Sequence, residues 1–189
     1  GISQKFVASA MQMDLSVCDW YAYTDNFGTT EEKKFVFYFS HIVAELKKKY
    51  NKIYLIRNER FPELAVFDFD TGERFEPDYV LFFQRKKTDG FEQLQIFVEP
   101  KGTQLLEKDE WKEKFLLQME KEAIPVKTFV DDSEYKICGL HFFNQDTRMK
   151  EFDAEMQNLT GTNIYKYPET EPAPSMVAED STPYGKKEG

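Results

Sequence analysis

The sequence has few of the residues on which several protein classes depend. It contains two cysteines, Cys18 and Cys138, in 189 residues. Two cysteines this far apart are too few for a disulfide framework and do not have the spacing of a metal knuckle. We therefore expect reduced thiols and a cytoplasmic location.

Long apolar runs and an excess of positive charge are also missing. The longest apolar runs, such as FVFYF and YVLFF, are far shorter than the roughly 20 residues of a membrane helix, and no charged-then-apolar leader opens the chain. We expect a protein that does not bind membranes. The net charge of −9 argues against a surface that binds DNA through positive charge alone.

The chain does have enough apolar residues to form one core. Hydrophobic residues make up 41% of it and aromatic residues 16%, which predicts a single folded domain. We assign residues 29–165 to this domain and leave the structure of residues 1–28 open. Residues 166–189 are rich in Pro, Glu, Ser and Gly, and are predicted to form a disordered tail or a linker.

Hydrophobic periodicity predicts an α/β fold. Helical spacing covers residues 29–50, and a second helix places Trp111, Phe115 and Met119 in the core. The predicted strands are NKIYLIRN, ELAVFDF, residues 74–84, residues 91–101 and EYKICGLHFF, and a last helix covers residues 146–159. We assign the core the order helix, three strands, helix, strand (αβββαβ), one strand fewer than the four β-rich runs before the second helix, and this order predicts a mixed central sheet with flanking helices.

Two of these strands carry charged residues at positions that we expect to be buried from water: Asp78, Glu99 and Lys101. If residues 74–84 and 91–101 form an antiparallel hairpin, Asp78 lies opposite the region of residues 97–99, where facing Cβ atoms are about 4.5–5.5 Å apart. Side-chain alternation places Glu99 and Lys101 on the same face. Without further context, a strand end and an ordinary ion pair would explain them.

Two carboxylates in a partly dry site repel each other unless one is protonated or a cation lies between them. Hard oxygen ligands with incomplete coordination suit Mg²⁺, with Mn²⁺ as a substitute. Beside such a metal, Lys101 could orient a water, stabilise developing negative charge or help to deprotonate the nucleophile. The set predicts metal-assisted hydrolysis of phosphodiesters.

Two further groups are candidate metal ligands. On the first helix Glu32 lies closer to the centre of the apolar stripe than Glu31, so we prefer Glu32, with Glu31 as the alternative. Glu32 also has a structural explanation, because TTEE from Thr29 is typical of a capping box. The backbone carbonyl of Pro100 is available as well, since proline has no N–H to contribute to a sheet.

These residues resemble the PD-(D/E)XK nuclease superfamily, with PD at Pro77 and Asp78 and EPK at residues 99–101. The segments GTTEEKKF, IRNE, RFEPDYVLFF, IFVEPKG, DEWKEKF and GLHFFN, in this order, are similar to the C-terminal endonuclease domain of the Res subunit of type III restriction enzymes. The resemblance implies a restriction-endonuclease-like core. It also implies Asp78 and Glu99 as Mg²⁺ ligands, Lys101 as catalytic lysine and a helix glutamate as auxiliary ligand.

The same resemblance implies an endodeoxyribonuclease that cuts double-stranded DNA together with partners. In that family a helicase-like motor in the parent chain uses ATP, and a methyltransferase (Mod) subunit recognises the site. This sequence has no GxxxxGK phosphate loop, so we expect ATP use only in a motor domain outside it. Two alternatives remain: a DNA repair or recombination nuclease of the same superfamily, and a catalytically inactive nuclease fold that serves as a docking module.

Overall fold

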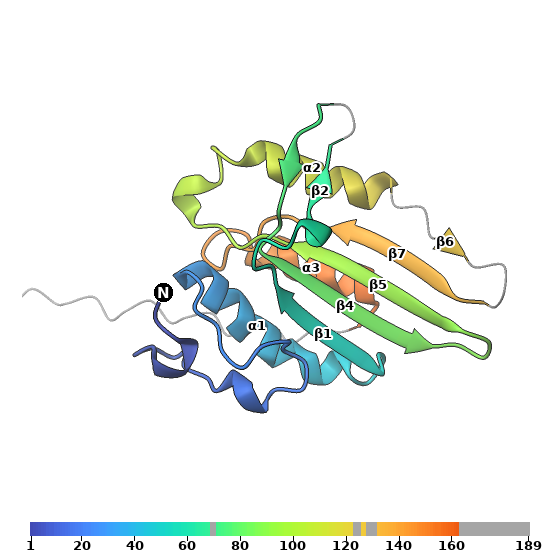
Figure 1. Cartoon of the computed structure of the whole chain (residues 1–189), viewed down its shortest axis with the longest axis horizontal. Helices are drawn as coiled ribbons and strands as arrows, with labels where there is room; N and C mark the ends of the chain where they lie inside the picture. Colours follow the sequence, from blue (N-terminus) through green and yellow to red (C-terminus); the bar gives the residue numbers. More distant parts are fainter. Residues whose placement is uncertain (69–70, 123–125, 128–131, 163–189) are drawn as a thin grey trace, which may run out of the picture.

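The computed structural model describes residues 1–68, 71–122, 126–127 and 132–162, which form an α/β structure around one mixed sheet (Figure 1). The five-stranded sheet has the order β1-β4-β5-β7-β6. Its strands are β1 (Lys52–Arg57), β4 (Tyr79–Lys86), β5 (Phe91–Val98), β6 (Val126–Lys127) and β7 (Glu134–Gly139). Strands β1, β4 and β5 form an antiparallel meander, whereas β5 and β7 are parallel. The predicted mixed sheet is confirmed.

Helices cover both faces of this sheet. Helices α1 (Thr30–Leu46) and α3 (Met149–Thr160) pack on one face, and α2 (Glu110–Glu122) packs on the other. In β4, Leu81 belongs to the core on the α1 side, and its neighbour Val80 contacts the α2 side. Because successive side chains of a strand point to opposite faces, a doubly covered sheet needs apolar residues at both positions.

Helix α1 begins at a capping box. The Thr29 hydroxyl accepts the Glu32 N–H at 3.3 Å, and the Glu32 carboxylate accepts the Thr29 N–H at 3.1 Å. These two bonds satisfy backbone donors that the first turn leaves free. The apolar stripe that follows is fully buried at Phe35, Phe39 and Leu46, which confirms the predicted helix, although it ends at Leu46 and not at Tyr50 as predicted.

Residues 1–28, which the sequence left open, belong to the folded domain. Trp20 and Tyr21 are buried in the core on the α1 side, and Tyr21 forms a bridge to Leu55 of β1. The Leu55 N–H donates to the Trp20 carbonyl at 2.7 Å. The segment therefore covers the outer edge of β1.

The predicted strands over residues 91–101 and 134–143 end earlier, at Val98 and Gly139, and two others are wrong in larger part. The run ELAVFDF does not join the main sheet: residues Pro62–Leu64 form a 3₁₀ turn, and β2 (Val66–Phe67) pairs with β3 (Arg74–Phe75) in a separate two-stranded ribbon. The strand predicted over residues 74–84 is interrupted between β3 and β4, because Pro77 has no N–H to donate. The ribbon lies beside α2 (Figure 1). Phe75 of the ribbon contacts Trp111 of α2.

The other helix predictions need small corrections. Trp111 on α2 is 39% exposed and does not lie in the core, whereas Leu116 is fully buried. The last helix starts at Met149 instead of residue 146. The predicted tail, residues 166–189, lies outside the described residues. No helix in the described part of the chain is long and apolar enough to cross a membrane.

Candidate functional site

The predicted site residues lie beside the ends of strands β1, β4 and β5, and in this subsection we call this border of the main sheet its edge. The pair Arg57–Tyr79 ends the β1–β4 ladder, and the pair Tyr79–Val98 ends the β4–β5 ladder at the same edge. Asp78 comes directly before this edge on one strand and Glu99 directly after it on the other. The hairpin register therefore brings together two acids that are 21 residues apart in sequence.

Asp78 and Glu99 are in direct contact. The Asp78 backbone N–H donates to Glu99 Oε2 at 2.9 Å. Both residues follow the alternation that points Val80 and Phe97 toward α2, so the two acids share one face of the sheet. This is the geometry that the sequence predicted for them.

Lys101 is held between two carboxylates. Its Nζ lies 2.8 Å from Glu99 Oε1 and 2.8 Å from Asp109 Oδ2, in the loop that leads into α2. The backbone on either side of Pro100 is tied to Phe143: the Phe143 N–H donates to the Glu99 carbonyl, and the Lys101 N–H donates to the Phe143 carbonyl. Lys101 is therefore confined in both backbone and side chain.

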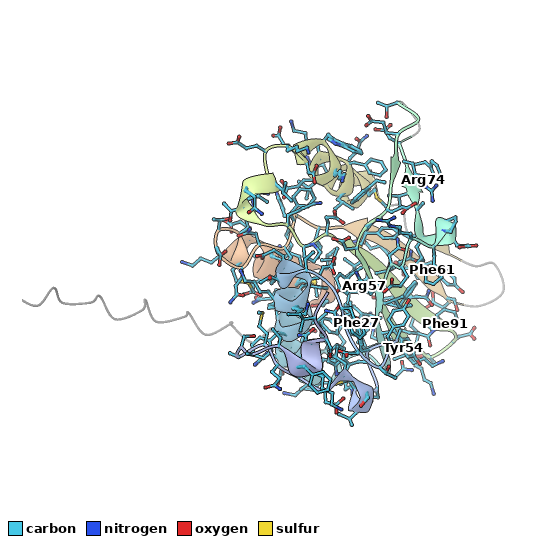
Figure 2. All side chains as sticks on the ribbon, turned by 60° about the vertical axis from the view of Figure 1, so that its left-hand side comes forward. Phe27, Tyr54, Arg57, Phe61, Arg74 and Phe91 are labelled. Carbon is cyan, nitrogen blue, oxygen red and sulfur yellow. The ribbon has the colours of Figure 1, made fainter. Side chains whose placement is uncertain are left out.

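Glu32 approaches the same edge from the N-terminus of α1. Its Oε2 atom accepts from Arg57 Nε at 3.2 Å as well as from the capping-box N–H, and Figure 2 shows Arg57 beside α1. Glu31 instead forms an ion pair with Lys34 at 3.0 Å. Of the two helix glutamates, Glu32 is the one that reaches the site, and it caps the helix at the same time.

A polar cleft of about 280 Å³ joins Glu32 to Asp78. The residues that line it are Glu32, Arg57, Asn58, Glu59, Arg60, Glu76 and Asp78. Glu99 and Lys101 do not line this cleft; they lie behind Asp78, toward α2. Asp78 therefore lies between the cleft and the ion pair of Glu99 and Lys101.

Burial and neighbouring charge both act on the acids. Burial, together with the charges of Glu99 and Glu32, raises the pKa of Asp78 to about 8. Burial also raises the pKa of Glu99, although Lys101 opposes the shift. Burial lowers the pKa of Lys101, but Glu99 and Asp109 outweigh it and hold that pKa above its usual value. Lys101 is consequently a permanent cation at neutral pH.

The donor set suits Mg²⁺ only in part. Among the residues that the structure describes, no three His, Cys, Asp or Glu side chains form a group that could hold a metal ion. Glu99 is paired with Lys101, and Glu32 is paired with Arg57. Mg²⁺ needs only one or two carboxylates when water and phosphate complete its shell. The Asp78 carboxylate fits this role, because it has no hydrogen bond or ion pair in the described chain.

Several residues at this edge were not singled out from the sequence. Arg57, Asn58 and Arg60 line the cleft, and Asp109 holds Lys101. A signal for the first three existed, since the polar residues of IRNER follow an apolar strand directly and must emerge at its end. Asp109 had none, because only the fold brings the loop before α2 back to residue 101.

A sequence profile of the family HI_1054_C, described as a C-terminal domain, matches residues 3–163. The chain belongs to the HI_1054_C family. A protein of Haemophilus influenzae named "Uncharacterized protein" is 37% identical over 138 residues, which cover 69% of this chain and 29% of that protein. The chain therefore spans less than a third of the length of this relative. No solved structure matches the chain.

Proposed function

We propose that this HI_1054_C domain is a Mg²⁺-dependent DNA endonuclease with a restriction-endonuclease-like fold. One observation carries the proposal: Asp78, whose pKa is raised and whose carboxylate pairs with no described residue, contacts Glu99 at the end of two paired strands, and a fixed lysine lies beside them. Glu99 is paired with Lys101, so the cost falls on Asp78, an acid buried beside another acid without a cation of its own among the described residues. A divalent cation that binds Asp78 and Glu99 removes this cost.

Each residue has a defined part in the proposed reaction. Asp78 and Glu99 hold the cation, and Glu32 and the Pro100 carbonyl are further candidate ligands. The bound Mg²⁺ would polarise the phosphodiester and lower the pKa of a water. Lys101 stays protonated between Glu99 and Asp109, which favours stabilisation of developing negative charge over proton abstraction.

The parent enzyme that we propose is a type III restriction enzyme, with this chain as the cleavage domain of its Res subunit. The order of the six similar segments supports this, as does the description of the family as a C-terminal domain. The helicase-like motor, its ATP and the Mod subunit lie outside this chain in the proposal. Such partners would hold the DNA, which a chain with a net charge of −9 does poorly alone.

Nicking of supercoiled plasmid in Mg²⁺ tests the cleavage step. Asp78→Asn, Glu99→Gln and Lys101→Ala should each lower the rate by roughly a hundredfold or more, because each removes charge at the reacting phosphate. Asp19→Asn is the matched control, since Asp19 is an exposed acid that pairs with Lys47. Normal cleavage by the three site variants would overturn the assignment.

Thermal denaturation gives a readout that does not depend on activity. Mg²⁺ or Mn²⁺ should raise the melting temperature of the unmodified chain, because a ligand that binds only the folded state stabilises it. The Asp78→Asn variant should lose this shift, and Asp19→Asn should retain it. If the unmodified chain shows no shift and no cleavage, the alternative of a docking module without chemistry replaces the proposal.

A further inference from the structure

The cleft beside Asp78 is lined by Asn58, whose side-chain hydrogen-bond donor the proposed reaction does not use. The Asn58 Nδ2 group is buried and has no partner among the described residues. The rest of Asn58 is fixed, since its N–H donates to the Asp78 carbonyl at 2.7 Å and its Oδ1 accepts the Phe61 N–H at 2.9 Å. A buried donor without an acceptor is costly, so an acceptor from a ligand would fit here.

The backbone at Arg60 provides a second, independent sign of a binding site. Arg60 has a φ of 64°, and within the described residues it is the single residue other than glycine with a positive φ. Side chains disfavour this conformation, and residues held in it gather at functional sites. Arg60 lines the cleft, and its guanidinium forms no ion pair with any described residue.

We propose that Asn58 and Arg60 bind a phosphodiester oxygen of the nucleic acid backbone next to Asp78. The inference rests on the proposed function and names two residues that position its substrate. The Nδ2 group and the guanidinium can only donate, and phosphate oxygens can only accept. Arginine also matches the shape of a phosphate with its paired N–H groups.

The charges in the cleft add a condition to this binding. Four acids line it, namely Glu32, Glu59, Glu76 and Asp78, against Arg57 and Arg60. Arg57 is already paired with Glu32 and Glu59. An anion alone would be repelled, so binding of the phosphodiester should need a divalent cation at Asp78.

Fluorescence anisotropy with a labelled DNA duplex measures this binding. Ca²⁺ serves as the cation, because it uses the same hard oxygen ligands. Asn58→Asp keeps the oxygen that accepts the Phe61 N–H but removes the donor, and should weaken binding roughly tenfold or more. Arg60→Gly should weaken binding similarly and lower the salt dependence of binding by about one counterion.

Each variant has a matched control on the far side of the molecule. Asn51→Asp makes the same chemical change at the opposite end of β1, where Asn51 Oδ1 also accepts a backbone N–H, that of Lys86, at 3.0 Å. Lys48→Ala removes an exposed positive charge beyond the C-terminus of α1. Both controls should bind DNA like the unmodified chain.

Stability separates a binding role of Arg60 from a structural one. Glycine adopts a positive φ without steric cost, so Arg60→Gly should keep or raise the melting temperature while it weakens DNA binding. A clear fall in melting temperature with unchanged binding would overturn the proposal. The proposal would also be overturned if Arg60→Gly weakened binding to only one of two unrelated DNA sequences, because phosphate contacts do not depend on sequence.

The failure of this inference can be told apart from that of the proposed function. If the unmodified chain nicks plasmid and Asn58→Asp and Arg60→Gly have the same KM and affinity as their controls, only the inference fails. If the unmodified chain binds the duplex equally well with and without Ca²⁺, the predicted need for a cation is wrong and the inference fails as well. If the unmodified chain shows no Mg²⁺-dependent cleavage but binds DNA in the presence of Ca²⁺, and the two variants lose this binding, only the proposed reaction is overturned.

Discussion

At the scale of single residues, Asp78 is the position where stability and proposed function oppose each other. Its carboxylate is largely removed from water beside Glu99, and no described residue pairs with it. The result is a pKa raised above the roughly 3.9 of an unfolded aspartate. The folded chain therefore binds the proton of Asp78 more tightly than the unfolded chain does.

This difference in pKa predicts a pH-dependent stability. Below about pH 4 Asp78 is protonated in both the folded and the unfolded chain, so it does not lower the free energy of unfolding. As the pH rises toward about 8, the unfolded chain releases this proton first, and the free energy of unfolding falls. Asp78→Asn should therefore melt higher than the unmodified chain near pH 8 and similarly near pH 4. Each 1 kcal/mol gained corresponds to about 2–4 °C. Circular dichroism melts across this range measure it.

Asp19→Asn is again the control, because its exposed carboxylate should leave the melting temperature unchanged at both pH values. If Asp78→Asn were less stable than the unmodified chain near pH 8, Asp78 would be a stabilising residue. Asp78 would then not be an uncompensated acid, and the main support for a cation site would be lost.

At the scale of elements, the contact between α2 and β7 determines where the Lys101 partner lies. Gly139 lets α2 approach closely: a Cβ added there would be 2.5 Å from the Leu116 carbonyl oxygen. The Glu113 carboxylate on α2 accepts the Phe142 N–H at 2.9 Å and is also paired with Arg148. These contacts fix the helix whose preceding loop carries Asp109.

Gly139→Ala should destabilise the domain by about 1–3 kcal/mol, because backbone atoms cannot move aside as a side chain can. Gly102→Ala is a matched substitution, since the three atoms nearest to the added Cβ there belong to the flexible side chain of Gln104. Urea denaturation of both variants measures the difference. Equal stability of the two would mean that α2 moves easily and that the position of Asp109 is not set by this contact.

At the scale of the whole molecule, the folded unit begins before residue 29. Trp20 is 5% exposed and packs edge-to-face on Phe39 of α1, at 5.3 Å between ring centroids. Phe6 of the same segment is 73% exposed. We expect Trp20→Ala to lower the free energy of unfolding by about 3–5 kcal/mol and Phe6→Ala to leave it unchanged.

Denaturant unfolding of the two variants tests this pair. A shortened chain that starts at residue 29 should be less stable than the full one, because it also exposes the edge of β1 that Tyr21 covers. If Trp20→Ala and Phe6→Ala unfold alike, the segment is an accessory and the boundary at residue 29 holds.

Local patterns in the sequence were sufficient for most of the elements of the main sheet and for the helices. The apolar stripe and TTEE motif of α1, the β4–β5 hairpin and the facing of Asp78 and Glu99 follow from periods of 3.6 and 2 and from strand pairing. These depend on neighbours in the chain or on one tight turn. The run ELAVFDF was misassigned because its apolar residues suit a strand in either sheet, and short runs do not reveal their partner.

The sequence by itself determined that a helix, a meander and a second helix would form, and that two acids and a lysine would meet on one face. Only the tertiary structure decided that Asp109 clamps Lys101, that Arg57 reaches Glu32, and that the strained Arg60 borders the cleft. The reason is physical: these contacts join segments whose distance depends on how layers pack, and packing depends on all side chains between them at once.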